Sequence, residues 1–148
     1  MREILFRGID EGTNEWVYGY YYEKPDYYCG DKRYYIFDDK TISKYNVLHE
    51  TVGQYTGLTD KNGKKIFEGD IVESTSALVD LYGRKSGKET TRFYEVVVTA
   101  DNSSFTYGTR EIGETYISRP IYKENSQRFY SVIGNIHDNP ELLEVVRK

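Results

Sequence analysis

Four carboxylates lie close together in the middle of the chain and could hold a magnesium ion: Asp60, Glu68, Asp70 and Glu73. Carboxylate oxygens are the ligands that magnesium prefers, and a bound ion could promote nuclease-like hydrolysis. Each residue also has a structural interpretation, because Asp60 and Asp70 begin or end turns, whereas Glu68 and Glu73 flank strands. We favour the structural interpretation, so the sequence predicts no catalytic and no metal-binding residue. A magnesium-dependent enzyme built on Asp60, Glu68 and Asp70 is the less favoured alternative.

A second candidate is the segment 82–94, where basic residues stand beside aromatic ones. The run Gly83–Lys88 looks like a phosphate-binding loop, but only three residues separate its glycines, and Glu89 stands where Ser or Thr would bind magnesium. Basic side chains beside rings can instead follow a phosphate backbone while bases stack. Many solvated loops share this composition. The candidate nucleic-acid contacts are Tyr82, Arg84, Lys85, Lys88, Arg92 and Tyr94.

Other reactive residue types are scarce. The chain contains two histidines and one cysteine, too few for a structural zinc site without several carboxylates. It has no nucleophile elbow and no dinucleotide-binding fingerprint. A dyad of Cys29 with a histidine is compatible with the sequence, although no pattern around Cys29 favours a reactive thiol. We therefore predict no cofactor.

The elements that must position these residues are strands and turns. Alanine occurs twice and leucine seven times, whereas tyrosine occurs 16 times, a composition typical of sheets. Turn residues at 60–63 and 68–70 separate short strands within Val52–Val72. In Trp16–Tyr22, the alternation places Trp16, Tyr18, Tyr20 and Tyr22 on one face of a strand. Further strands are expected at Phe93–Ala100 and at Arg128–Ile136, the latter with a kink at Gly134, and a short helix is expected to start at Asn139–Pro140. We predict an all-β fold of coiled, barrel-like sheets with a short C-terminal helix.

No linker divides the 148 residues, so the sequence predicts a single domain. Within it, residues 74–91 are rich in Gly, Ser and Lys and have little to bury, which predicts a mobile loop or insertion.

The net charge is −4, so no global basic field gathers nucleic acid or anionic lipid. A single cysteine permits no intrachain disulfide. The N-terminal apolar run ends at Arg7, far short of a secretory signal, and no apolar stretch approaches the ~18 residues of a membrane helix. These features predict a cytoplasmic protein that does not contact membranes. Abundant tyrosine suits core packing and subunit interfaces, and so predicts a homo-oligomer with a protein partner.

Six blocks, in this order along the chain, resemble the YopX family of phage and prophage proteins. They are REILFRG (2–8), WVYG (16–19), TVGQYTGL (51–58), DKNGKKIFEGDIV (60–72), VIGNI (132–136) and NPEL (139–142). The resemblance implies a complex, coiled, oligomeric all-β fold carried by phages of Gram-positive bacteria, hence a protein of the bacterial host cell. It implies no established activity and no catalytic residues. The matching positions that we interpret as structural are Gly53, Gly57, Asp60, Gly63, Glu68, Gly69, Asp70, Gly134 and Asn135.

Taken together, the sequence predicts a non-catalytic, oligomeric protein-interaction module. The alternative is a nucleic-acid-binding module that uses residues 82–94.

Overall fold

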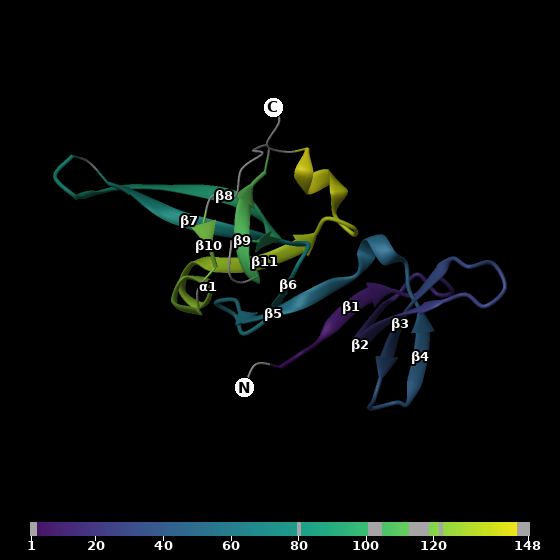
Figure 1. The fold of residues 1–148 in the computed structure, drawn as a ribbon. Coiled ribbons are helices and arrows are strands. Elements are labelled where there is room, and N and C mark those ends of the chain that lie inside the picture. Colours follow the sequence, from purple (N-terminus) through teal and green to yellow (C-terminus); the bar gives the residue numbers. More distant parts are fainter. Residues whose placement is uncertain (1–2, 80, 101–104, 113–118, 122, 145–148) are drawn as a thin grey trace. The chain divides into compact units, whose positions relative to one another are not determined.

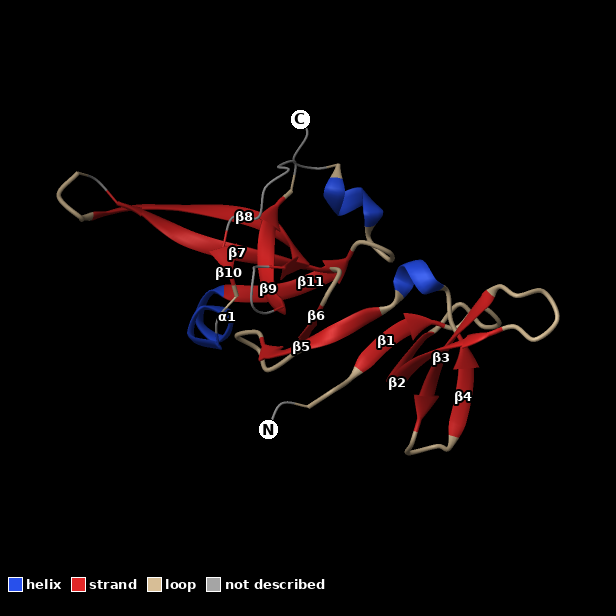
Figure 2. Ribbon diagram, in the orientation of Figure 1, coloured by secondary structure: helices blue, strands red, loops and turns tan. Residues whose placement is uncertain are grey.

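The structure is a computed structural model that describes residues 3–79, 81–100, 105–112, 119–121 and 123–144. Two antiparallel sheets dominate it, with strand orders β4-β3-β2-β1-β5-β6 and β10-β9-β8-β7-β11 (Figures 1 and 2). The chain forms two compact units, unit 1 (Met1–Gly57) and unit 2 (Leu58–Lys148). The mainly β fold expected from composition is confirmed. None of the helices in the described ranges is long and apolar enough to cross a membrane.

Unit 1 is built on a meander of short strands that curls back on itself. Its elements are β1 (Phe6–Ile9), β2 (Trp16–Pro25), β3 (Lys32–Asp38), β4 (Ser43–Asn46), the 3₁₀ helix η1 (His49–Thr51) and the start of β5 (Gly53–Thr59). The chain after β4 returns to β1, because Asp10 forms a bridge with Val47 and Leu48 N donates to Ile9 O at 3.0 Å. This return curls the sheet without closing a barrel.

The inner face of the curl holds the core of unit 1. Ile36 on β3 is fully buried and Val47 nearly so, and both lie against Gly8 of β1. The ring of Phe6 lies 5.5 Å from that of Tyr21 and extends this apolar layer. A side chain on Gly8 would meet Val47 Cβ at 3.1 Å, so the glycine lets β1 approach the residues behind it.

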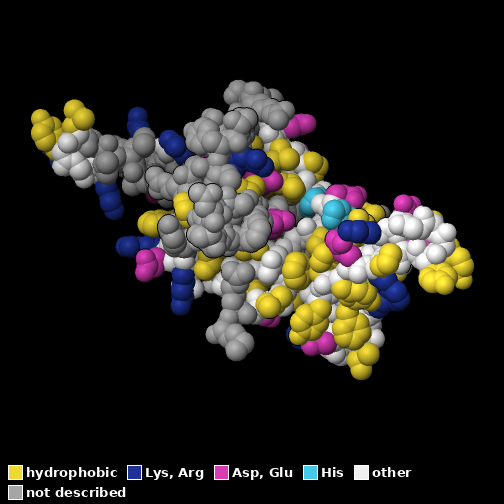
Figure 3. All heavy atoms as spheres, viewed as in Figure 1, with side chains coloured by type: hydrophobic (Ala, Val, Ile, Leu, Met, Phe, Trp, Pro, Cys, Tyr) yellow, Lys and Arg dark blue, Asp and Glu magenta, His cyan; other side chains and the backbone are white. Residues whose placement is uncertain are grey.

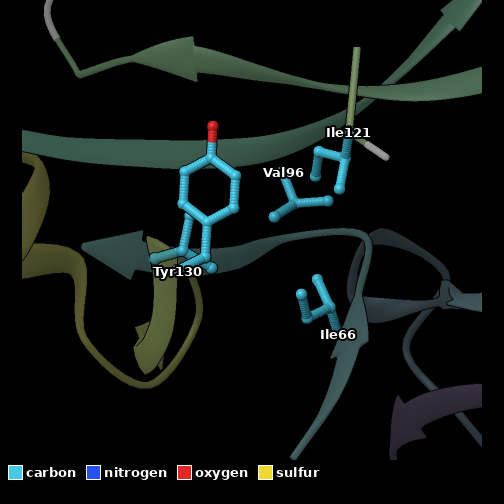
Figure 4. Packing of buried hydrophobic residues seen from close by; sticks show 5 residues of the cluster. Ile66, Val96, Ile121 and Tyr130 are labelled. Atoms are coloured by element: carbon cyan, nitrogen blue, oxygen red, sulfur yellow. The ribbon is translucent and has the colours of Figure 1, made fainter. Parts of the chain in front are cut away.

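Unit 2 consists of a five-stranded sheet, the short strand β6 and two short helices. Its elements are β6 (Lys65–Phe67), β7 (Asp70–Val79), β8 (Lys85–Ala100), β9 (Phe105–Glu111), β10 (Arg119–Pro120), α1 (Lys123–Phe129), β11 (Tyr130–Asn135) and the 3₁₀ helix η2 (Pro140–Leu143). Its core cluster brings together Ile66, Val72, Val96, Ile121 and Tyr130 from five parts of the unit. Figure 4 shows the side chains of this cluster converging between the strands, with Ile66, Val96, Ile121 and Tyr130 labelled.

Within residues 74–91, for which the sequence predicts a mobile loop, 74–79 and 85–91 belong to the antiparallel strands β7 and β8. The Gly, Ser and Lys residues of this segment are typical of loops, which is why composition did not reveal the strands. Thr75 and Thr91 pair across it, with their hydroxyl oxygens 2.9 Å apart. Mobility of this segment stays a prediction.

The C-terminal part follows the predicted order, except that the last helix is shorter than expected and that a further helix, α1, precedes β11. The kink expected at Gly134 is present as a register shift between Val132 and Gly134 in the pairing of β11 with β7. The helix expected after Asn139 is a single 3₁₀ turn, and Asn139 makes no side-chain cap to it. Its Oδ1 accepts instead from Asn135 N at 3.2 Å, so the side chain stabilises the preceding turn. The short helix α1 was not indicated by the sequence.

Candidate interaction surfaces

Asp60 is a buried hydrogen-bond acceptor in the turn between β5 and β6. Its Oδ1 accepts from the backbone N–H groups of Asn62 at 2.8 Å and Lys64 at 2.9 Å. Its Oδ2 accepts from Val132 N on β11 at 2.8 Å, and the residue is only 2% exposed. One carboxylate therefore shapes its own turn and ties that turn to a strand 72 residues away in sequence.

Asp70 has a similar role at the start of β7. It is 2% exposed, and its Oδ2 accepts from Phe67 N at 2.7 Å, which closes the turn around Gly69. Gly69 has φ of 90°, a conformation that side chains other than glycine rarely adopt. These bonds support the structural interpretation of the acidic residues. Among the described residues, no three His, Cys, Asp or Glu side chains cluster as metal ligands.

The remaining positions interpreted as structural lie in turns or in the strands β5 and β11. Gly57 and Gly63 have positive φ, and a side chain on Gly134 would overlap the amide of Asn139. Asn135 is nearly buried, and its Oδ1 accepts from His137 N at 3.0 Å and Asp138 N at 2.8 Å. Glu68 is half-buried, and Gly53 is buried at the start of β5.

The basic and aromatic segment 82–94 lies on the β7–β8 hairpin, whose residues 74–92 we call the arm. The arm extends from the rest of the unit 2 sheet by roughly 30 Å, given ~3.3 Å per residue (Figure 1). Leu81 and Tyr82 occupy its tip, with exposed fractions of 101% and 83%. The guanidinium of Arg84 lies 5.2 Å from the centre of the Tyr82 ring.

The structure separates the six candidate nucleic-acid contacts. Tyr82, Arg84, Lys85, Lys88 and Arg92 are exposed along the arm. Tyr94, in contrast, is half-buried against the core cluster of unit 2 and meets the ring of Tyr130 edge-on at 6.1 Å. We therefore leave Tyr94 out of the surface that the arm presents.

A second surface lies on the outer side of the unit 1 sheet, and its side chains come from β2 and β3. The register pairs Tyr20 with Phe37 and Tyr22 with Tyr35, and directly opposite residues of antiparallel strands share a face. Tyr18, Tyr20 and Tyr22 are 45%, 52% and 39% exposed. Hydrophobic side chains, tyrosine included, are visible over this unit in Figure 3. We call this surface the aromatic face; it comprises Trp16, Tyr18, Tyr20, Tyr22, Tyr35 and Phe37.

Three of the four basic residues of β2, β3 and β4 lie on one side of the sheet, and Lys32 lies with the carboxylates on the other. Successive residues of a strand point to opposite sides, so the register places Lys24, Arg33 and Lys44 on the side of the aromatic face. The only carboxylates within β2, β3 and β4, Glu23 and Asp38, fall on the opposite side. The Lys44 ammonium lies 4.8 Å from the centre of the Tyr35 ring. The aromatic face is thus basic, although the chain as a whole is acidic.

On the inner side, Glu23 accepts from Tyr21 Oη at 3.0 Å and from Lys32 Nζ at 3.2 Å. The hydrogen bond from Tyr21 and then the one from Lys32 lower the pKa of Glu23. Burial and the contact with Glu23 raise the pKa of Tyr21. Both shifts keep the pair in the state in which the phenol donates to the carboxylate.

Asp26, in the turn between β2 and β3, is expected to remain ionised in acid. Its bonds from Tyr28 N at 2.9 Å and Arg33 Nε at 2.9 Å lower its pKa from 3.8 to about 2. Because the folded pKa is the lower one, the stabilisation of this turn is complete above pH 3.8 and is lost as the pH falls through about 2. Carboxyl carbon NMR should give this midpoint in the wild-type protein and a higher one in Arg33→Gln. A wild-type midpoint at 3.8 would contradict the prediction.

A groove of about 310 Å³ in unit 1 brings Cys29 and His49 to the same lining. The His49 ring lies flat on that of Tyr34, with centres 4.2 Å apart. The side chain of Cys29 forms a hydrogen bond with Asp26. The described contacts of Cys29 and His49 are thus with Asp26 and Tyr34, and not with each other.

Comparison with known proteins adds a family to this architecture. No curated protein matches the chain. Among solved structures, the crystal structure of protein EF1440 from Enterococcus faecalis is similar over 97% of this chain and 99% of that one, with 24% sequence identity and a TM-score of 0.49. The family model described as YopX protein matches residues 5–144, nearly the whole chain. The chain therefore belongs to the YopX family.

Proposed function

We propose that the chain is a non-catalytic accessory protein of a phage or prophage, and that it acts in the cytoplasm of the bacterial host as a homo-oligomer that binds other proteins. The observation that carries this proposal is the arm of unit 2, with Leu81 and Tyr82 exposed at its tip. The phage context is supported by membership of the YopX family.

The arm has the features of an element that is completed by a partner. Burying a large apolar side chain stabilises a complex by ~1.5–3 kcal/mol relative to leaving it in water. Both tip side chains are exposed, and the guanidinium of Arg84 lies 5.2 Å from the centre of the Tyr82 ring. A second copy of the chain could bury the tip, and that burial would stabilise a homo-oligomer.

A non-catalytic role is supported by what the acidic residues do. Both carboxylate oxygens of Asp60, and Oδ2 of Asp70, accept hydrogen bonds from backbone N–H groups inside the protein. Carboxylates held in this way stabilise turns and are poorly placed to bind a metal ion or to exchange protons with a substrate.

Light scattering behind size exclusion tests the proposal. The wild-type protein is expected to have a mass that is a multiple of the single-chain mass, and the double variant Leu81→Ser, Tyr82→Ser is expected to have the mass of one chain. The matched control is Tyr27→Ser, because Tyr27 is 95% exposed in another hairpin turn. This control should leave the mass unchanged. A monomeric wild-type protein at high micromolar concentration would remove the support for an oligomer.

Nucleic-acid binding by the arm is a second candidate. The specific observation is that Arg84, Lys85, Lys88 and Arg92 are all exposed along one two-stranded ribbon. The major groove of duplex DNA admits such a ribbon. Contacts between basic side chains and phosphates weaken as salt is added. Glu89 lies among them and reduces the positive charge of the arm.

A further inference from the structure

We propose that the aromatic face of unit 1 binds single-stranded nucleic acid, with bases stacked on Tyr18, Tyr20 and Tyr22 and the phosphate backbone held by lysines. This binding site lies on a different unit from the arm, so it goes beyond the function proposed above and can succeed or fail independently of it.

The spacing of the rings fits splayed bases. Alternate residues of one strand lie ~6.6 Å apart, twice the rise per residue, so Tyr18, Tyr20 and Tyr22 form a row of rings along β2. Bases of a single strand can be unstacked from one another and laid on aromatic side chains of a sheet. The row is widened by β3, where Tyr35 stacks on Tyr22 with ring centres 5.1 Å apart and an interplanar angle of 22°.

The charges around the rings fit a phosphate backbone. Lys24 and Lys44 lie on the same side of the sheet as the tyrosines: Lys24 continues their row along β2, and Lys44 lies beside the row on β4, level with Tyr20 across Phe37. Arg33 shares that side, although its Nε already donates to Asp26. The carboxylates of these strands are on the other side, so an anionic strand lying on the rings meets cations and avoids Glu23 and Asp38.

Single-stranded nucleic acid fits this surface better than two other partners. In a duplex, each base is already covered by its neighbours, so the rings would have no base to stack on. Protein interfaces are enriched in tyrosine but depleted in lysine, whereas here Lys24 and Lys44 share the surface with the tyrosines. The surface offers stacking and charge without a set of groups that reads base edges, so binding should tolerate many sequences.

Fluorescence anisotropy of labelled oligothymidylate, titrated with the full-length chain at low salt, tests the proposal. Saturable binding that weakens as salt is added is expected. Tyr20→Ala and Tyr22→Ala should each weaken it about tenfold, whereas Tyr20→Phe, which keeps the ring, should not. Lys44→Ala should reduce the dependence of log affinity on log salt by about one.

Two controls separate this surface from the rest of the protein. Tyr27→Ala removes a tyrosine that is 95% exposed in a turn beyond the aromatic face, and it should bind as the wild type does. The arm variant Lys85→Glu, Lys88→Glu should retain binding of the oligonucleotide. The single tryptophan of the chain, Trp16, belongs to the aromatic face, so its emission should be quenched by the oligonucleotide in the wild type and in the arm variant.

The outcomes are distinct. Loss of affinity in the tyrosine variants, with circular dichroism unchanged, supports the proposal. Absence of binding at tens of micromolar protein overturns it. So does binding by the Tyr20→Ala and Tyr22→Ala variants that is as tight as binding by the wild type. Binding that is lost only in the arm variant, or that duplex competitor abolishes as well as single strand does, assigns nucleic acid to the arm and also overturns it.

Discussion

Replacement of Asp60 by alanine is expected to lower the free energy of unfolding by about 3 kcal/mol, because three backbone N–H groups lose their acceptor. Two of these groups, on Asn62 and Lys64, hold the turn between β5 and β6. The third, on Val132, joins that turn to β11. Urea unfolding followed by circular dichroism measures the change as a shift of the midpoint.

The series Asp60→Ala, Asp60→Asn and Glu124→Ala separates the role of the hydrogen bonds from that of charge. Asparagine keeps one oxygen and can still accept the two bonds of the turn, so Asp60→Asn should cost less, about 1 kcal/mol. Glu124 is exposed on α1, and its removal should change stability by less than ~0.5 kcal/mol. Equal midpoints for Asp60→Ala and Glu124→Ala would show that the buried carboxylate does not stabilise the fold.

Replacement of Gly19 by alanine is expected to disrupt the pairing of β2 with β3 and to destabilise unit 1 by about 3 kcal/mol. A Cβ atom at this position would overlap the carbonyl oxygen of Phe37 and would lie 2.7 Å from its carbonyl carbon. The obstacle is backbone, which cannot move aside as the end of a side chain can. Since Trp16 is the only tryptophan and lies on the same strand, its emission should report the loss of structure.

Gly12→Ala is the matched control for Gly19→Ala. Both changes add one methyl group within unit 1, but the nearest atom to a Cβ at Gly12 is Asp10 Oδ1, at 3.8 Å. That is ordinary van der Waals contact, so stability should remain within ~0.5 kcal/mol of the wild type. If the two variants unfolded at the same urea concentration, the close approach at Gly19 would have no energetic consequence.

Asp60 and Gly19 show how far inference from sequence can go. Asp60 and Gly63 predict a turn, because the conformational preferences of four neighbouring residues are enough to form one. The bond from Val132 to Asp60 depends on strands distant in sequence, so no local pattern contains it. Likewise, alternation placed Tyr18, Tyr20 and Tyr22 on one face, but the clash that makes Gly19 indispensable required the position of Phe37.

The candidate surfaces show the same division. The composition of segment 82–94 drew attention to its basic and aromatic residues, and five of the six proved to be exposed on the arm. Tyr94 did not, because its partner in burial, Tyr130, comes from another strand. The hairpin and α1 escaped detection because the strands of the arm and the polar run of α1 lack the apolar periodicity on which sequence analysis depends.

By itself, the sequence determined the class of fold, the sites of its turns, the alternation of β2 and, through six blocks of residues, the family. These are properties of local conformational preference and residue order. Only the tertiary structure decided that the tyrosines of β2 face solvent together with Lys24 and Lys44, while Glu23 and Asp38 lie behind the sheet. The reason is that β2, β3 and β4 acquire a common surface only when their register is set, and the register follows from packing of Ile36 and Val47 on the inner face.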